Sequence, residues 1–219
     1  MTYAALEAGA KTRHLSILGG FHPDPDDNVP NGCRTLLMLG PDEPDFWPAF
    51  TQSPEYCDGN ADPMDRWSER VIAGWASDLG ATPMFPFGGP PYLPFYSWAT
   101  RSGRTAASPV QFLVHDRAGL FVSFRGALAL PVKVELPTVS TPPCQTCSDE
   151  PCKTACPVSA LTPAGYDVAA CKTYLDTSAG AGCVENGCAV RRACPVSQKF
   201  GRLPAQSAYH MRQFKGDLR

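Results

Sequence analysis

The feature that most constrains this chain is a dense group of cysteines in its C-terminal third. Eight of the ten cysteines lie between Cys144 and Cys194, and only Cys33 and Cys57 lie elsewhere in the 219 residues. A chain of this length buries enough apolar surface to fold without cross-links. Residues 1–10 have no basic start and no long apolar run, so no secretion signal is expected. Clustered cysteines in a cytoplasmic chain predict metal or redox chemistry rather than a disulfide framework.

The clustered cysteines form two runs that close in the same way. The first run is Cys144-x2-Cys147-x4-Cys152-x3-Cys156-Pro157, and the second set is Cys171, Cys183, Cys188 and Cys194-Pro195. Both runs end in the sequence Cys-Pro-Val-Ser. This pattern resembles the bacterial two-cluster ferredoxins, in which the cysteine before proline ligates the other cluster. Eight thiolates match two 4Fe–4S clusters with none left over.

The resemblance to these ferredoxins implies a ligand set for each cluster. The first set is Cys144, Cys147, Cys152 and Cys194, and the second set is Cys156, Cys171, Cys183 and Cys188. The first run has two more residues between its second and third cysteines than the ferredoxin run, and the second set is looser still. Two structural zinc sites of four thiolates each are one alternative. A single cluster with four spare cysteines is another.

A wider resemblance comes from the residues before the cysteines. Residues 109–121, 125–128 and 136–137 lead in order into Cys144. This order resembles the C-terminal half of epoxyqueuosine reductases and reductive dehalogenases. Residues 62–65, taken with the same hairpin, are similar to the cobalamin-processing proteins of the methylmalonic aciduria and homocystinuria type C family. The resemblance implies a nitroreductase-like core that binds a corrinoid, with a pocket between the core and the cluster module.

The same resemblance implies candidate contacts to the corrinoid. Arg104, Thr105, Ala106 and Ser108 occupy the place of a corrin-contacting loop, where small side chains would let a flat macrocycle approach the backbone. An ordinary turn with small residues is the alternative. Epoxyqueuosine reductases carry a catalytic aspartate in an F-x-D-x-x-P segment, but the matching residues 85–90 here contain no acid. No catalytic residue and no substrate are therefore assigned.

The sequence predicts a mixed α/β fold in three parts. Residues 1–140 are expected to form the nitroreductase-like, corrinoid-type core, and residues 141–200 a small ferredoxin-like module with two clusters. Residues 201–219 are expected to form a basic C-terminal tail. Residues 191–219 hold seven basic residues and one acid, although the whole chain has a net charge of -2. Such a segment can hold an acidic partner, an anionic cofactor group or the acidic body of its own chain.

Local patterns predict individual elements of the core. The apolar residues 34–39 predict a buried strand. Residues 62–80 predict a helix, because they begin with Asp-Pro, repeat apolar side chains every three or four positions and end in glycine. Residues 110–114 and 120–124 predict the two strands of a hairpin. The first 30 residues and the segment before Cys57 are expected to be irregular.

Together these patterns predict a cytoplasmic iron–sulfur redox protein. It is expected to deliver single electrons from two 4Fe–4S clusters to bound cobalamin, in the reduction or processing of that cofactor. An electron-donor protein such as a flavodoxin or a ferredoxin reductase is the expected partner. The near-neutral charge and the lack of an 18-residue apolar stretch predict neither nucleic-acid binding nor a membrane span. A ferredoxin-like carrier that docks a partner enzyme, and a corrinoid-dependent reductase of an organic substrate, are the alternatives.

Overall fold

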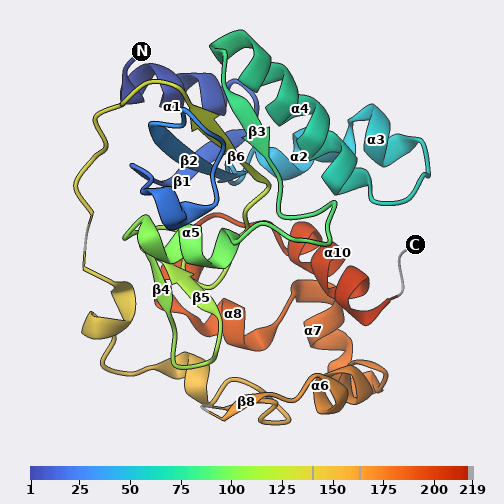
Figure 1. Cartoon of the computed structure of the whole chain (residues 1–219). Helices are drawn as coiled ribbons and strands as arrows, with labels where there is room; N and C mark the ends of the chain where they lie inside the picture. The colour runs from blue at the N-terminus through green and yellow to red at the C-terminus, as the bar shows by residue number, and fades with distance from the viewer. Residues whose placement is uncertain (140, 163, 217–219) are drawn as a thin grey trace. The chain divides into compact units, whose positions relative to one another are not determined.

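The computed structural model of the chain describes residues 1–139, 141–162 and 164–216. It is a mixed α/β protein with two compact units (Figure 1). The first unit comprises Met1–Thr105 and Ser123–Ser140, and the second comprises Ala106–Val122 and Thr141–Arg219. The segment of the expected hairpin thus lies in the same unit as the clustered cysteines, and so does the basic C-terminal segment.

The first unit is built on a four-stranded antiparallel sheet. In spatial order its strands are β1 (Leu15–Phe21), β2 (Thr35–Pro41), β6 (Gly126–Leu130) and β3 (Thr82–Met84). Every residue of β2 and of β6 is buried, and Leu37 lies opposite Leu128 in their ladder. The buried strand expected at residues 34–39 is therefore confirmed.

Several helices belong to the first unit. They are α1 (Tyr3–Lys11), the 3-10 turn η1 (Pro25–Asp27), α2 (Phe46–Thr51), α3 (Pro54–Cys57), α4 (Pro63–Leu79) and α5 (Phe95–Arg101). Of these, α1, α4 and α5 pack against the sheet. The expected helix is confirmed as α4, which packs on β3 and β6 with Met64, Trp67 and Trp75 buried. Gly80 ends this helix because it adopts the left-handed conformation, with φ at 63°.

Two segments of the first unit that were predicted to be irregular form regular structure, so both predictions are wrong. The first 30 residues contain α1 and β1, and the segment before Cys57 contains α2 and α3. The glycine pair inside β1 weakens its sequence signal, yet close packing requires it there. A Cβ on Gly20 would lie 2.8 Å from Cδ2 of Leu37. The strand is thus fixed by its neighbours rather than by its own propensity.

The second unit consists mainly of short helices. Two small sheets pair β4 (Thr105–Ala107) with β5 (Leu113–His115), and β7 (Leu161–Thr162) with β8 (Gly165–Tyr166). Its helical elements are η2 (Pro143–Thr146), η3 (Pro151–Lys153), α6 (Val168–Leu175), η4 (Ser178–Gly180), α7 (Ala181–Asn186), α8 (Ala189–Ala193), α9 (Pro195–Gln198) and α10 (Pro204–Lys215). Helix α10 packs against α7, so the basic segment contributes a folded helix to this unit.

The hairpin expected over residues 110–124 forms only in part. Its first strand shortens to β5, and residues 120–124 form no strand. The Leu120 N–H donates instead to Oγ of Ser197 at 2.8 Å, and the Phe121 carbonyl accepts from Nη1 of Arg202 at 2.8 Å. Buried backbone groups need partners, and here side chains from beyond the cysteines supply them in place of a neighbouring strand.

Gly119 is the tightest point of this packing. Its φ is +56°, and a Cβ there would lie 2.4 Å from the Ser197 backbone nitrogen. We expect Gly119→Ala to lower the free energy of unfolding of the second unit by about 2–5 kcal/mol, since strain and overlap with a backbone atom add. Urea unfolding followed by circular dichroism measures this loss. Gly216→Ala is the control, because its φ is +98° and nothing lies within 4 Å; equal losses would contradict the packing argument.

Candidate functional site

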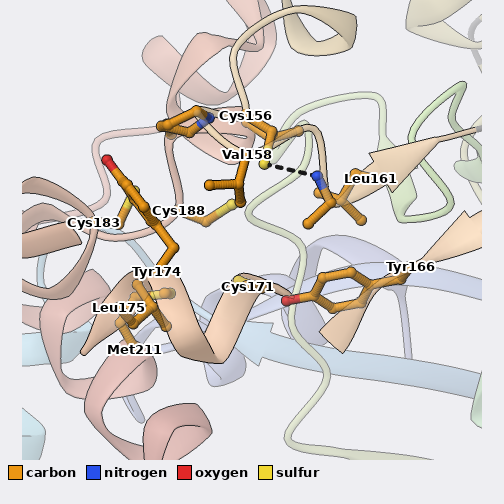
Figure 2. Close-up of a pocket in the computed structure, with 14 residues that line it drawn as sticks. Cys156, Val158, Leu161, Tyr166, Cys171, Tyr174, Leu175, Cys183, Cys188 and Met211 are labelled. Atoms are coloured by element: carbon orange, nitrogen blue, oxygen red, sulfur yellow. Dashed lines mark hydrogen bonds between the residues drawn. The ribbon is translucent and has the colours of Figure 1, made fainter. Parts of the chain in front are cut away.

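Four of the clustered cysteines line one pocket of the second unit (Figure 2). They are Cys156 after η3, Cys171 in α6, Cys183 in α7 and Cys188 at the N-terminal cap of α8. The cavity between these side chains is narrow, about 20 Å³ in volume. Its other walls are mostly apolar side chains, including Val158, Leu161, Leu175, Val190 and Met211. The structure therefore brings together the second ligand set that the ferredoxin resemblance implies.

We call the four cysteines of this pocket the second group, and the other four, Cys144, Cys147, Cys152 and Cys194, the first group. Burial, followed by the neighbouring Cys152, Cys194 and Cys147, raises the pKa of Cys144 to about 11. Cys144 packs against the apolar cluster that contains Cys152 and Cys194. Cys194 thus lies near cysteines that precede it by more than 40 positions.

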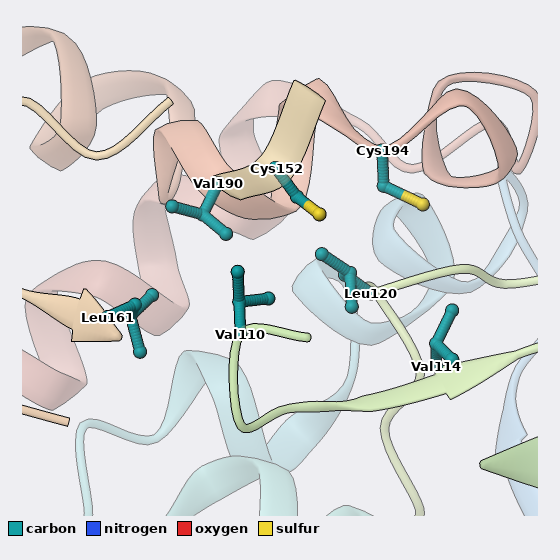
Figure 3. Close-up of a cluster of buried hydrophobic side chains, with 7 residues drawn as sticks. All are labelled: Val110, Val114, Leu120, Cys152, Leu161, Val190 and Cys194. Carbon is teal, nitrogen blue, oxygen red and sulfur yellow. The ribbon is translucent and has the colours of Figure 1, made fainter. Parts of the chain in front are cut away.

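An apolar base holds the first group in place (Figure 3). Cys152 and Cys194 are both buried in a cluster with Val110, Val114 and Leu120. These three apolar residues come from the hairpin segment, whereas the cysteines come from the C-terminal segment. The shared core explains why the two segments belong to one unit.

The chemistry of the two donor sets fits a metal cofactor. Burial is the largest cause that raises the pKa of the thiols of Cys144, Cys152 and Cys188. Thiols with raised pKa values keep their protons at neutral pH, and a metal centre binds by replacing those protons. Each group therefore offers four soft sulfur ligands inside a largely apolar wall.

A partly buried cation, Arg191, lies beside Cys188 of the second group. Burial lowers the pKa of Arg191, and the Cys188 thiol and the Tyr166 phenol act in the opposite direction. The Arg191 guanidinium donates to the Leu120 carbonyl and lies 4.2 Å from the centre of the Phe112 ring. A buried guanidinium is costly without a nearby anion. A four-iron cluster bound by four thiolates is such an anion, so this surrounding fits one.

Tyr166 directs its hydroxyl toward the same group. Burial is the largest cause that raises the pKa of its phenol, the neighbouring Cys171 acts in the same direction, and Figure 2 shows the hydroxyl directed toward Cys171. The ring is held edge-on to Phe112 at 5.9 Å and stacked on Phe214 at 6.1 Å between centroids. No sequence motif marks this tyrosine, because its role depends on the fold that places it against Cys171.

We expect Tyr166→Phe to make the reduction potential of the second cluster more negative by about 20–60 mV. A hydrogen bond to a ligating sulfur stabilises the reduced, more negative state, and its loss costs about 0.5–1.5 kcal/mol for one electron. Redox titration followed by electron paramagnetic resonance measures the shift. Tyr174→Phe is the matched control: Tyr174 lines the same pocket, but its hydroxyl donates to the Ala179 carbonyl at 2.7 Å. Equal shifts in both variants would exclude a specific bond to Cys171.

The candidate corrinoid contacts include part of a short strand. Thr105 and Ala106 belong to β4, so a strand replaces the loop expected there. Nη1 of Arg104 lies 3.4 Å from the Ile17 carbonyl, and Ser108 is buried. Thr105 is also buried, and its hydroxyl has no hydrogen-bond partner among the described residues. A buried hydroxyl without a partner fits a site where a ligand group completes the bond.

The described residues contain no preformed site for a single metal ion. Within residues 1–139, 141–162 and 164–216, no three His, Cys, Asp or Glu side chains lie close enough together to hold one ion. Four thiolates around one zinc lie roughly 4 Å from one another, since each lies about 2.3 Å from the metal. A four-iron cluster is larger and holds its thiolates farther apart.

Comparison with known proteins assigns the chain to no group. No family model, curated protein or solved structure matches it. In the described part of the chain, no helix combines the length and apolar character needed to span a bilayer.

Proposed function

We propose that the chain is an iron–sulfur redox protein that binds two 4Fe–4S clusters and passes single electrons to a bound cofactor. The observation that carries this proposal is the arrangement of the clustered cysteines. Cys156, Cys171, Cys183 and Cys188 line one pocket, and Cys144, Cys152 and Cys194 pack in one apolar cluster. The partly buried Arg191 supports the same assignment, because an anionic cluster would offset its charge.

The residues around the second group suit electron transfer. When bound, the clusters would supply reversible one-electron oxidation and reduction. Apolar side chains such as Leu161 and Met211 line the pocket beside the sulfurs and reduce their contact with water. Tyr166 and Arg191 place a hydrogen-bond donor and a positive charge beside these sulfurs, and both favour the reduced state.

For the electron acceptor we propose the corrinoid that the resemblance implies. Cobalamin would bind a nitroreductase-like core, with Arg104, Thr105, Ala106 and Ser108 among its contacts. The unpaired, buried hydroxyl of Thr105 supports this choice. The electron donor would be a cytoplasmic flavodoxin or ferredoxin reductase, and residues 141–200 would act as the ferredoxin-like module.

Metal analysis after anaerobic purification tests the clusters. We expect about eight iron atoms and about eight acid-labile sulfides per chain. Zinc without sulfide would overturn the proposal. About four iron atoms and four sulfides per chain would also contradict it, because one cysteine group would then hold no cluster.

Titration with cobalamin tests the acceptor separately. Binding is expected to change the cobalamin absorption spectrum toward the base-off form, and reduced clusters are expected to reduce the cobalt. Thr105→Val is expected to weaken binding without altering the iron content, since it removes only a hydroxyl. If intact, iron-loaded protein at micromolar concentration does not bind cobalamin, the corrinoid is excluded and a carrier that docks a partner enzyme is favoured.

A further inference from the structure

A second pocket of the cysteine-bearing unit has the chemistry of an anion site. Its cavity volume is about 150 Å³, and it shares no lining residue with the cysteine pocket. Its polar walls include Arg192, Arg202, Ser197, Ser207, Asn186 and Gln198, and no aspartate or glutamate lines it. We propose that this pocket binds a phosphate group, either free inorganic phosphate or the phosphate ester of a small molecule.

The two arginines are held in place by the backbone. Nε of Arg192 donates to the Gly187 carbonyl at 3.1 Å, and its two terminal nitrogens have no protein partner among the described residues. Nη1 of Arg202 donates to the Phe121 carbonyl at 2.8 Å, and the guanidinium lies 5.4 Å from the centre of the Phe121 ring. Guanidinium groups fixed in this way lose little entropy when they bind an oxyanion through paired N–H groups.

Neutral donors complete the site. The Ser197 hydroxyl accepts the Leu120 N–H, so its own proton stays available to a further acceptor. Helix α10 begins at Pro204, and no side chain caps its first N–H groups. Pro204 and Ser207 line the pocket, which places the positive end of this helix at its wall. Two cations, hydroxyl donors and uncapped amides match the charge and oxygen number of phosphate better than those of a single carboxylate.

The position of the pocket gives such a site a role near the clusters. Asn186, Arg192 and Ser197 lie on the segment that also carries Cys188 and Cys194, one cysteine from each group. An anion bound here would contact the same short helices that hold both groups. The inference itself does not depend on the clusters, because every contact proposed is to protein.

Calorimetric titration of the anaerobically purified chain with inorganic phosphate tests the proposal. Ionic strength is held constant with sodium chloride, so that a general charge effect gives no isotherm. We expect one saturable site, and we expect Arg192→Gln to weaken it at least tenfold while the cluster absorption spectrum stays unchanged. Ser207→Ala is expected to weaken it a few-fold. A second titration with phenyl phosphate identifies the kind of ligand. Tighter binding of phenyl phosphate than of inorganic phosphate indicates a phosphate ester as the natural ligand. Equal or tighter binding of inorganic phosphate indicates free phosphate.

Arg212→Gln is the matched control, since this exposed arginine of α10 does not line the pocket and its loss removes the same charge. It is expected to change phosphate affinity less than twofold. Equal losses in the Arg192→Gln and Arg212→Gln variants, or no saturable binding, would overturn the phosphate site. Binding of poly-glutamate that depends on Arg192, without binding of phosphate, would overturn it in favour of an acidic protein partner.

Discussion

Replacing Cys183 with alanine is expected to reduce the iron content from about eight atoms to about four atoms per chain. Cys183 lines the pocket of the second group. A 4Fe–4S cluster that loses one of its four thiolate ligands is expected to dissociate from the protein. Cys147→Ala is expected to remove the other four iron atoms. Alanine is preferred to serine because a serine oxygen can still bind iron. Iron and sulfide analysis of the purified variants measures the loss.

Double variants test which cysteines share a cluster. Cys156→Ala combined with Cys183→Ala is expected to lose the same four iron atoms as either single variant, because both residues line one pocket. Cys152→Ala combined with Cys156→Ala is expected to lose all eight, although only three residues separate them in sequence. The opposite results would contradict the division into two groups.

A cysteine outside both groups provides the control for these variants. Cys33 lies in the first unit, where its sulfur contacts the Thr35 carbonyl at 3.5 Å and burial raises the pKa of its thiol. Cys33→Ala is therefore expected to keep all eight iron atoms. Loss of iron in this variant would show that iron content reports general damage to the fold rather than the loss of a ligand.

Arg191→Met is expected to make the reduction potential of the second cluster more negative by about 50–150 mV. The change removes one positive charge at roughly 6 Å in a poorly solvated site, which corresponds to about 1–3 kcal/mol for one electron. The reduced cluster carries the greater negative charge, so it loses more stabilisation than the oxidised cluster. Methionine keeps most of the volume against the Phe112 ring. Redox titration followed by electron paramagnetic resonance measures the shift.

Two further variants separate charge from packing at this position. Arg191→Lys keeps the charge and is expected to restore most of the potential. Arg192→Met removes the neighbouring exposed charge, and in phosphate-free buffer it is expected to shift the potential by less than about 20 mV because water and salt screen it. An unchanged or less negative potential in Arg191→Met would contradict the role of this guanidinium.

The elements predicted correctly from sequence are those with strong local signals. The helix α4 has Pro63 at its start and Gly80 at its end, and β2 is a continuous apolar run. The resemblance to two-cluster ferredoxins implied one set of four cysteines, Cys156, Cys171, Cys183 and Cys188, that the structure places around one pocket. In each case the residues that decide the structure are near one another in the sequence or repeat a known spacing.

The elements predicted wrongly depend on residues far away in the sequence. Residues 120–124 have the composition of a strand, but Ser197 and Arg202 bind the backbone of Leu120 and Phe121 from about 80 positions further on. The contact of Tyr166 with Cys171 also requires β8 and α6 to be folded. Local propensity depends only on neighbouring residues in the sequence and cannot indicate such distant partners. Tertiary contacts therefore determine the secondary structure of these residues.

The second unit is discontinuous in sequence, and this bears on how the proposed clusters would be assembled during synthesis. Ala106–Val122 is made before Cys144, the first clustered cysteine, and therefore leaves the ribosome before it. The apolar base of Val110, Val114 and Leu120 is thus available when Cys152 and Cys194 emerge to pack on it. A fragment that begins at residue 141 would lack that base. The cysteine segment therefore cannot be moved into another protein by itself, and residues 106–122 must be transferred with it.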